Sequence, residues 1–479
     1  MWRDLASTIA SSWFGFALIA ASVLMFMVQG ALALLAMVEA VRQRRHSKLV
    51  DRLSLFEGDL APPISILLPV RDEQLAIADR VRSLLRLRYP GFEIVVINDG
   101  STDGTLASLV KAFGLRRARR TARARVPRNR VRGVYSSPDA PFLTVIDMVS
   151  GGRARALNTG LAYAHHPLFL AIDAGTVLER DTLIQLALPF YENTETLAVG
   201  GVVRPANGCV IRNGALMSSG VPHAILVRLQ AVEQLRAMLA GWLGWNLIDS
   251  LYVVSGALGL FSRDAVLAVG GYRPATRGEE MDLVMRMQRW AGRRRRRLAV
   301  RFVANAVAWT EYPENPVALA KAQARAHRGL AESLWLNREL LLNTRFAFHH
   351  GLAFCFQVAV ELLGPVVELL GMALTVWLAI AGNLQAPFAI IFLAVYVAGG
   401  TTLSLVGAMI ERFACPRYHG GRAFESLAIA ALLESFGYRQ AIALFRVCGL
   451  VAALLFGGEL DAYRRTTARI AADRAREAA

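Results

Sequence analysis

The chain has 479 residues, enough for two to four domains. Hydrophobic residues make up 54%, charged residues 19%, and the mean hydropathy is +0.38. These values exclude a disordered chain and are unusual for a soluble enzyme, but they are typical of a membrane protein that carries a soluble domain. The net charge of +17 is almost all arginine and favours anionic lipid or phosphate-bearing partners. The four cysteines have no metal-ligand spacing, which predicts buried thiols.

The first membrane-spanning segment is predicted over residues 13–38, which contain no charged residue. About 26 residues of helix are long enough to cross a bilayer. Basic residues follow from Arg42 to Lys48, so the positive-inside rule places the next segment in the cytoplasm and the N-terminus outside. A cleaved signal peptide is the alternative, although its apolar region is ordinarily shorter.

Apolar segments return near the C-terminus. Residues 363–382 and 386–410 predict a transmembrane hairpin. Residues 424–457 are interrupted by Glu434, Arg439 and Arg446, which leaves open a third crossing or helices lying in the interface. The arginine-rich tail after residue 460 is predicted to be cytoplasmic, which favours an even number of crossings after the soluble domain.

Residues 351–370, which overlap the first of these apolar regions, carry Glu361 and Glu368 next to Pro365. One interpretation is an interfacial helix with both acids facing water. The other is a polar path through the membrane, because ionisable groups within a membrane usually have a function.

Between these segments, short apolar runs alternate with helical stretches. The predicted strands are residues 64–70, 93–98, 143–147 and 169–173, and the predicted helices include residues 74–87 and 105–113. This alternation predicts a doubly wound, mostly parallel α/β sheet. Asp99, Asp147 and Asp173 lie at the carboxyl ends of strands, where such sheets bind ligands, and therefore predict a metal or nucleotide site.

An arginine-rich run over residues 116–132 interrupts the alternation. It has no interleaved aromatic residues on which bases would stack, so a solvated or lipid-facing loop is favoured over a nucleic-acid site. The shorter run at residues 293–297 is interpreted in the same way.

Several motifs follow one another in the middle of the chain. They are PVRDE at 69–73, INDGSTDG at 97–104, GGRARALNTG at 151–160, DAG at 173–175, SGALGLF at 255–261 with GGY at 270–272, Glu279-Glu280, and AQARA at 322–326. In this order, between membrane segments, the motifs resemble those of membrane-bound family 2 glycosyltransferases, the group of the cellulose, hyaluronan and poly-N-acetylglucosamine synthases. The resemblance covers residues 60–460.

The resemblance implies a GT-A nucleotide-diphospho-sugar transferase fold with transmembrane and interfacial helices. It implies that Asp173 binds a divalent cation, Mg²⁺ or Mn²⁺, and that Glu280 is the base of an inverting transfer. Cations of this kind prefer carboxylate oxygens, and a base must reach the acceptor hydroxyl. The implied nucleotide-binding residues are Asp72, Asp99, Asp147, Arg153 and Arg325, and the implied acceptor-binding residues are Gly256, Glu279 and Trp245.

The sequence departs from the family pattern at several chemical positions. Gly175 replaces the second acid of D-x-D, Glu280 replaces the usual Asp, and Arg153 replaces the usual Lys. Ala322 and Ala326 replace the Gln and Trp of Q-x-x-R-W. A catalytically inactive membrane scaffold is therefore the alternative to an enzyme, and a basic nucleic-acid-binding membrane protein is a third, less favoured class.

Structural interpretations of the same residues stay open. Thr276 and Glu279 fit a helix capping box, and Asp282 fits an exposed helix surface. Trp245 fits an interface anchor, and Asp72 fits an acid at a helix N-terminus.

The predicted organisation has five parts. They are a transmembrane helix with a basic flank (1–46), a cytoplasmic GT-A-like domain (47–317), interfacial helices (318–350), C-terminal transmembrane and interfacial helices (351–460) and a basic cytoplasmic tail (461–479). The predicted function is transfer of a sugar from a nucleoside-diphosphate donor to a glycan or lipid-linked acceptor in envelope or exopolysaccharide synthesis. The predicted location is the inner membrane, with anionic lipid and other envelope-assembly proteins as partners.

Overall fold

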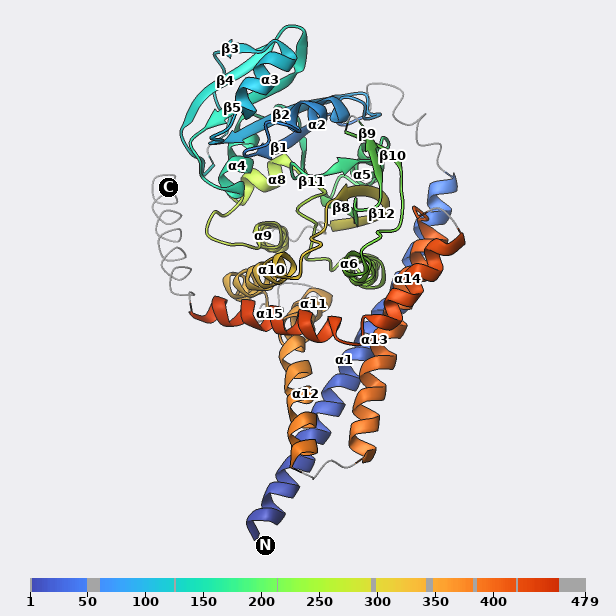
Figure 1. Cartoon of the computed structure of the whole chain (residues 1–479). Coiled ribbons are helices and arrows are strands. Elements are labelled where there is room, and N and C mark those ends of the chain that lie inside the picture. Colours follow the sequence, from blue (N-terminus) through green and yellow to red (C-terminus); the bar gives the residue numbers. More distant parts are fainter. Residues whose placement is uncertain are drawn as a thin grey trace.

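In the computed structural model, a sheet-containing domain lies at one end and three long helices extend from it (Figure 1). The structure describes residues 2–49, 61–124, 126–212, 214–293, 299–341, 348–381, 386–418 and 421–455. The predicted basic tail at 461–479 and the arginine run from residue 294 onward lie outside the described residues.

The centre of the domain is a parallel sheet. Its strands are β5 (Ala140–Met148), β2 (Phe92–Asp99), β1 (Ile64–Val70) and β6 (Leu168–Ala171), adjacent in that order. The four strands predicted from the sequence are confirmed. They are apolar at almost every position because helices cover both faces of a parallel sheet. The covering helices include α2 (Ile77–Leu84), α3 (Thr105–Phe113), α4 (Arg153–Tyr163) and α5 (Thr182–Glu192).

The complete sheet is mixed rather than mostly parallel, and its order is β3-β4-β5-β2-β1-β6-β11-β8-β12-β7. Besides the central strands, only β8 and β12 pair in parallel. The outer strands are β3 (Arg116–Ala118), β4 (Val131–Ser137), β7 (Val177–Leu178), β8 (Thr196–Pro205), β11 (Gly259–Ser262) and β12 (Ala299–Thr310). A separate hairpin pairs β9 (Val210–Arg212) with β10 (Ala215–Ser218).

The arginine run forms the outer edge of this sheet. Strand β3 lies at the end of the domain farthest from the long helices (Figure 1), and the loop that follows it packs against α4, where the Arg123 amide donates to the Ala162 carbonyl. Seven of the arginines are exposed, namely Arg116, Arg117, Arg119, Arg123, Arg128, Arg130 and Arg132. The run is therefore solvated, and its distance from the membrane helices argues against the lipid-facing alternative.

Further helices connect the sheet to the membrane region. They are α6 (Ile225–Leu235), η2 (Arg236–Trp242), α7 (Leu243–Leu247), α8 (Arg263–Ala268), α9 (Glu279–Arg293), α10 (Pro316–Leu336), η3 (Arg338–Leu340), α11 (Phe348–Phe356) and η4 (Gln357–Leu362). Of these, η2 and η4 are π-helical turns. Helix α9 packs between α8 and α10.

Three long apolar helices lie side by side away from the sheet: α1 (Trp2–Leu49), α12 (Gly364–Ile380) and α13 (Ala386–Ala414) (Figure 1). They correspond to the three membrane segments predicted from the sequence. By length and composition, four candidate spans occur in the described residues, and the fourth is residues 438–455.

The region that the sequence left ambiguous contains α14 (Gly421–Leu433) and α15 (Tyr438–Leu455). Helix α15 runs across the upper end of α12 rather than along it, and it packs against α10 (Figure 1). Helix α15 therefore does not lie alongside α12 as a parallel or antiparallel neighbour (Figure 1). Its charged residues are explained by partners on other elements, since Arg446 pairs with Glu233 of α6.

Candidate active site

Arg153, the first residue of α4, joins four segments of the domain. Its Nε donates to Asp173 Oδ1 at 2.8 Å, and its Nη2 donates to the Gly256 carbonyl at 2.7 Å. Its Nη1 donates to Glu279 Oε2 at 3.1 Å and also contacts the carboxylate of Glu280. Five predicted site residues therefore meet. They are Glu280, Asp173, Gly256, Glu279 and Arg153 itself.

The electrostatics of this cluster follow from burial and charge. Burial by itself lowers the pKa of Arg153, but the carboxylates of Glu280, Asp173 and Glu279 outweigh it and raise the pKa well above its usual value. Burial, followed by the charge of Glu280, raises the pKa of Glu279 to about 7, although Arg153 opposes the shift. Glu279 therefore titrates near neutral pH, where a general base or acid is most effective.

Asp99, at the end of β2, holds the loop that precedes Arg153. Its Oδ1 accepts from the Gly151 amide at 2.7 Å and its Oδ2 from the Gly152 amide at 2.9 Å. Gly152 has a φ of +83°, which favours glycine. Asp99 is 6% exposed, so its contacts fix the backbone at the start of α4.

Two other predicted nucleotide-binding acids lie around the same edge. Asp147 is buried, and its Oδ1 accepts from Asn98 Nδ2 at 2.8 Å. Asp72 is exposed, and its Oδ1 accepts from the Thr102 amide at 2.7 Å. Asp72 has a φ of +53°, a strained value for a residue other than glycine, in the loop after β1. Asp72 therefore links the loops that follow β1 and β2.

The first turn of α9 carries Glu279 and Glu280 and is anchored through Asp282. Asp282 is fully buried and accepts from Arg273 at 2.9 Å, Arg286 at 2.8 Å and Asn337 at 2.9 Å. Although burial raises the pKa of Asp282, Arg286 and Arg273 hold it below its usual value. The expectation that Asp282 lies on the helix surface was wrong, because two of its three partners, Arg273 and Asn337, come from outside α9.

Helix α10 completes this anchor. The Arg277 amide donates to Glu332 at 2.9 Å, and Ser333 donates to the Gly278 carbonyl at 3.1 Å. Thr276 Oγ1 accepts from the Gly278 amide, while the Glu279 carboxylate binds Arg153. This is not the expected capping box, and Glu279 is part of the acid cluster.

Tyr272 is a site residue that its motif did not assign individually. Its ring is wholly buried and packs edge-on against Phe169 and Phe261. Its hydroxyl has no hydrogen bond within the described part of the chain. Burial, with Glu280 nearby, raises the pKa of this hydroxyl well above its usual value. Only the fold brings the ring to the cluster, so the sequence carried no signal for it beyond the GGY motif.

Arg325, a predicted nucleotide-binding residue, lies apart from the cluster. Arg325 is exposed on α10, and no contact joins it to Arg153 among the described residues. The part of α10 that reaches the acid turn is around Gly329 and Ser333 instead. Gly175 lies close to Thr310, where an added Cβ would be 3.8 Å from its Oγ1.

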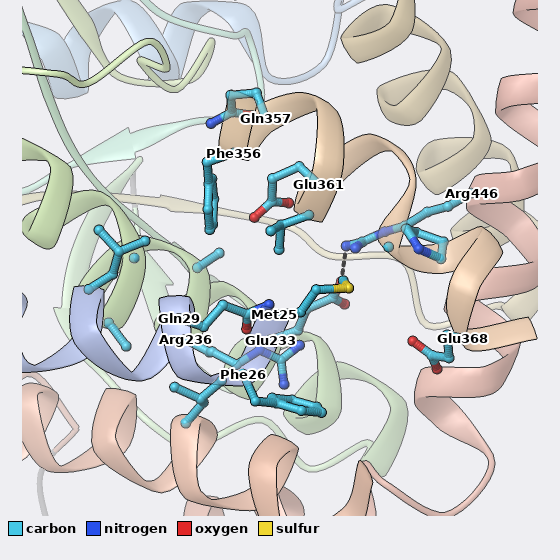
Figure 2. A pocket seen from close by; sticks show the side chains of 18 of the residues that line it. Met25, Phe26, Gln29, Glu233, Arg236, Phe356, Gln357, Glu361, Glu368 and Arg446 are labelled. Carbon is cyan, nitrogen blue, oxygen red and sulfur yellow. Dashed lines mark hydrogen bonds and ion pairs between the residues drawn. The ribbon is translucent and has the colours of Figure 1, made fainter. Parts of the chain in front are cut away.

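Trp245 is buried against Phe356, with ring centroids 5.2 Å apart, and lines a cavity of about 360 Å³ below the acid cluster. Figure 2 shows this cavity, to which α1, η2, η4, α12 and α15 contribute side chains. Met281, the neighbour of Glu280, also lines it. Trp245 therefore shares a cavity with Met281, the neighbour of Glu280, and its Nε1 makes no hydrogen bond to Arg153 in the described part of the chain.

The two acids of the apolar region share that cavity. Glu361 and Glu368 both line it (Figure 2), and Tyr396 donates to Glu368. Arg446 and Glu233 form an ion pair in its wall. The polar groups therefore face a common space between the helices, which favours the polar-path interpretation.

Comparison with known proteins supports the sequence resemblance. Residues 65–147 match the family described as glycosyl transferase family 2. The chain is 26% identical over 278 residues to the poly-beta-1,6-N-acetyl-D-glucosamine synthase of Staphylococcus epidermidis, covering 57% of this chain and 56% of that protein. The synthase of Staphylococcus aureus strain COL is 25% identical over 273 residues, covering 57% and 55%. The chain thus aligns with about half the length of these relatives.

Among solved structures, the mannosyltransferase PcManGT from Pyrobaculum calidifontis, in complex with GDP-Man and Mn²⁺, has a TM-score of 0.50. It is 17% identical, and the match covers 88% of this chain and 99% of that one. This likeness bears on the fold, and it confirms the GT-A class predicted from the sequence.

Proposed function

We propose that this chain, which carries a family 2 glycosyltransferase domain, transfers a sugar from a nucleoside-diphosphate donor to a glycan or lipid-linked acceptor with inversion. The observation that carries the proposal is the cluster in which Arg153 gathers Asp173, Glu279 and Glu280. These acids come from two segments more than 100 residues apart and lie at the end of the sheet where α/β proteins bind ligands.

The residues present fit a divalent cation bound together with the donor. Asp173 is half exposed, and its Oδ2 makes no hydrogen bond within the described part of the chain. No three acidic, His or Cys side chains form a ready-made metal site in that part. Mg²⁺ and similar ions are commonly held by one or two carboxylates and the substrate phosphates. Asp173 would hold the cation, which neutralises charge on the departing diphosphate when bound.

The protein side chains would then perform the transfer. Glu280 takes the proton of the acceptor hydroxyl as that oxygen attacks the anomeric carbon from the face opposite the diphosphate. Gly256, whose carbonyl binds Arg153, and Glu279 form the acceptor side of the cluster. Asp99 keeps Gly151 and Gly152 in place, and this loop and Asp72 and Asp147 surround the donor.

The intact acid cluster argues against the inactive scaffold. Arg153 and Glu280 both depart from the family pattern, and their charged groups form an ion pair with each other. Ala322 and Ala326 are exposed on α10. The relatives that share the domain are named as polysaccharide synthases, which supports a role in envelope or exopolysaccharide synthesis.

The proposed setting is a cell membrane, with the sheet domain on the cytoplasmic side and the N-terminus outside. Helices α1, α12 and α13 would cross the bilayer, and α15 would lie in its interface. Arginines after the apolar part of α1 support this orientation. Reporter fusions at the N-terminus and after α13 test this orientation. A reporter after α13 that is found outside the cell would contradict it.

Calorimetric titration of the detergent-purified full-length protein tests donor binding. We expect UDP or GDP to bind more tightly with Mn²⁺ than without it, and Asp173→Asn to remove the Mn²⁺ effect. Asp139→Asn, an exposed acid on the β4–β5 turn, is the control and should bind as the wild type does. Absence of binding by either nucleotide would overturn the proposed function, and unchanged Mn²⁺ dependence in Asp173→Asn would overturn the role of Asp173.

A further inference from the structure

The Arg153 guanidinium uses most of its hydrogen-bonding capacity inside the protein. Of five N–H groups, one binds Asp173, two bind Glu279 and Glu280, and one binds the Gly256 carbonyl. One N–H of Nη2 remains for a ligand. The main role of Arg153 is therefore to fix the neighbouring acids, and a single N–H group is left to contact a diphosphate.

The Glu280 carboxylate is confined from its other side by Gly256. A Cβ on Gly256 would lie 2.8 Å from Glu280 Oε1 and 3.1 Å from Oε2. The carboxylate thus lies between a guanidinium and a backbone that has no room for a side chain. Its side chain is 15% exposed, so its position is set by these contacts rather than by solvent.

The two side chains depend on each other's length and shape. Aspartate at position 280 would withdraw the carboxylate by about 1 Å, a misplacement that can cost on the order of 100-fold in rate. Lysine at position 153 carries a compact ammonium with three rotatable donors and lacks the planar fork that reaches Asp173, Glu279, Glu280 and Gly256 together. Neither replacement preserves the arrangement by itself.

We propose that Arg153 is the positioning residue for the base, and that Arg153 and Glu280 work as a matched pair in which the longer acid is held back by the wider cation. This inference rests on the proposed function. The two departures from the glycosyltransferase pattern then act together, because the guanidinium of Arg153 binds the carboxylate of the longer acid, Glu280.

A double-mutant cycle on the full-length protein tests the pair. We expect Arg153→Lys and Glu280→Asp each to lower kcat by about 100-fold, with KM for the donor changed far less. The double variant should lose no more than about 100-fold in total, far less than the product of the two single losses, because either change alone already breaks the same contact. The pH profile of kcat should shift in Arg153→Lys, because the guanidinium no longer faces the base, and a purely structural role would not produce this shift.

The exposed ion pair Arg82–Asp79 supplies a matched control. Arg82→Lys with Asp79→Glu should leave kcat unchanged, singly and together. If the double variant Arg153→Lys/Glu280→Asp shows the product of the two single losses while the wild type transfers sugar, the pairing is overturned and the proposed function stands.

If the wild type transfers sugar from none of UDP-N-acetylglucosamine, UDP-glucose and GDP-mannose, the proposed function fails separately. The pairing is then decided by thermal unfolding of the same four proteins. A Tm loss in the double variant clearly smaller than the sum of the single losses supports a matched pair, and additive losses overturn it.

Discussion

The proposed donor side and the proposed acceptor side of the site are built in different ways. On the donor side, carboxylates bind backbone amides of nearby loops, as Asp99 does with Gly151 and Gly152 and Asp72 does with Thr102. On the acceptor side, the acids of α9 bind side chains of distant segments, as Glu280 does with Arg153. The donor side therefore depends on glycine-rich loops, and the acceptor side depends on ion pairs between elements.

The family-model match falls on the proposed donor side. The family match covers residues 65–147, which contain the β1 and β2 loops of the donor side. Backbone contacts of this kind need small residues and specific turns, so they leave short motifs. An ion pair between elements does not need a specific short motif, because either partner can be replaced by another residue of the same charge. Arg153 and Glu280, which both depart from the family pattern, form such a pair.

The largest expected effect is on the acceptor side, at the anchor of α9. Asp282→Ala leaves Arg273 and Arg286 without their shared carboxylate in a buried setting, which costs about 3–5 kcal/mol of unfolding free energy. Chemical unfolding in detergent measures this loss. Asp264→Ala, an exposed acid in α8, should change the free energy by no more than about 0.5 kcal/mol. Equal effects of the two substitutions would show that α9 is not anchored through Asp282.

A smaller loss is expected on the donor side. Asp99→Asn replaces one of two oxygens that accept backbone amides with an NH₂ group, which costs roughly 1.5–3 kcal/mol. It should also weaken UDP or GDP binding, because the Gly151–Gly152 loop loses its support. Calorimetry and unfolding on one preparation measure both effects. Unchanged stability would mean that the loop is held by other contacts.

The pH dependence of stability is expected to be smaller still. The folded-state pKa of Glu279 is about 7, above the unfolded value of 4.5, because the folded protein favours the protonated form. Stability from this group is complete below about pH 4.5 and is lost as the pH rises through 7. Between pH 6 and pH 8 the loss is about 1 kcal/mol.

Comparison of the wild type with Glu279→Gln isolates this effect, since other titrating groups are common to both. The difference in unfolding free energy between the two proteins should change by that amount over the range. A constant difference would show that Glu279 is ionised throughout and that Arg153 dominates its environment.

The regular parts of the fold were predictable because local sequence determines them. Strand β1 and helix α3 begin and end at the predicted residues, since an apolar run and an apolar periodicity define them. The placement of α15 was left open, because Arg446, which interrupts its apolar sequence, pairs with Glu233 of a distant element.

The site was predictable in part. Asp173, Glu279, Glu280 and Arg153 were identified through motif resemblance, and the structure brings them together. Asp282 was misjudged because its partner Asn337 lies 55 residues away, on α10. Arg325 was assigned by motif position alone, but the turn of α10 that contacts the acid segment comes later in the helix.

Transfer by Glu280→Gln, with donor binding measured on the same preparation, tests the central claim most directly. Glutamine keeps the size of the side chain and removes the base, so we predict donor affinity within a few-fold of the wild type and a rate lower by about 100- to 10,000-fold. Sugar transfer at the wild-type rate by this variant would contradict the account.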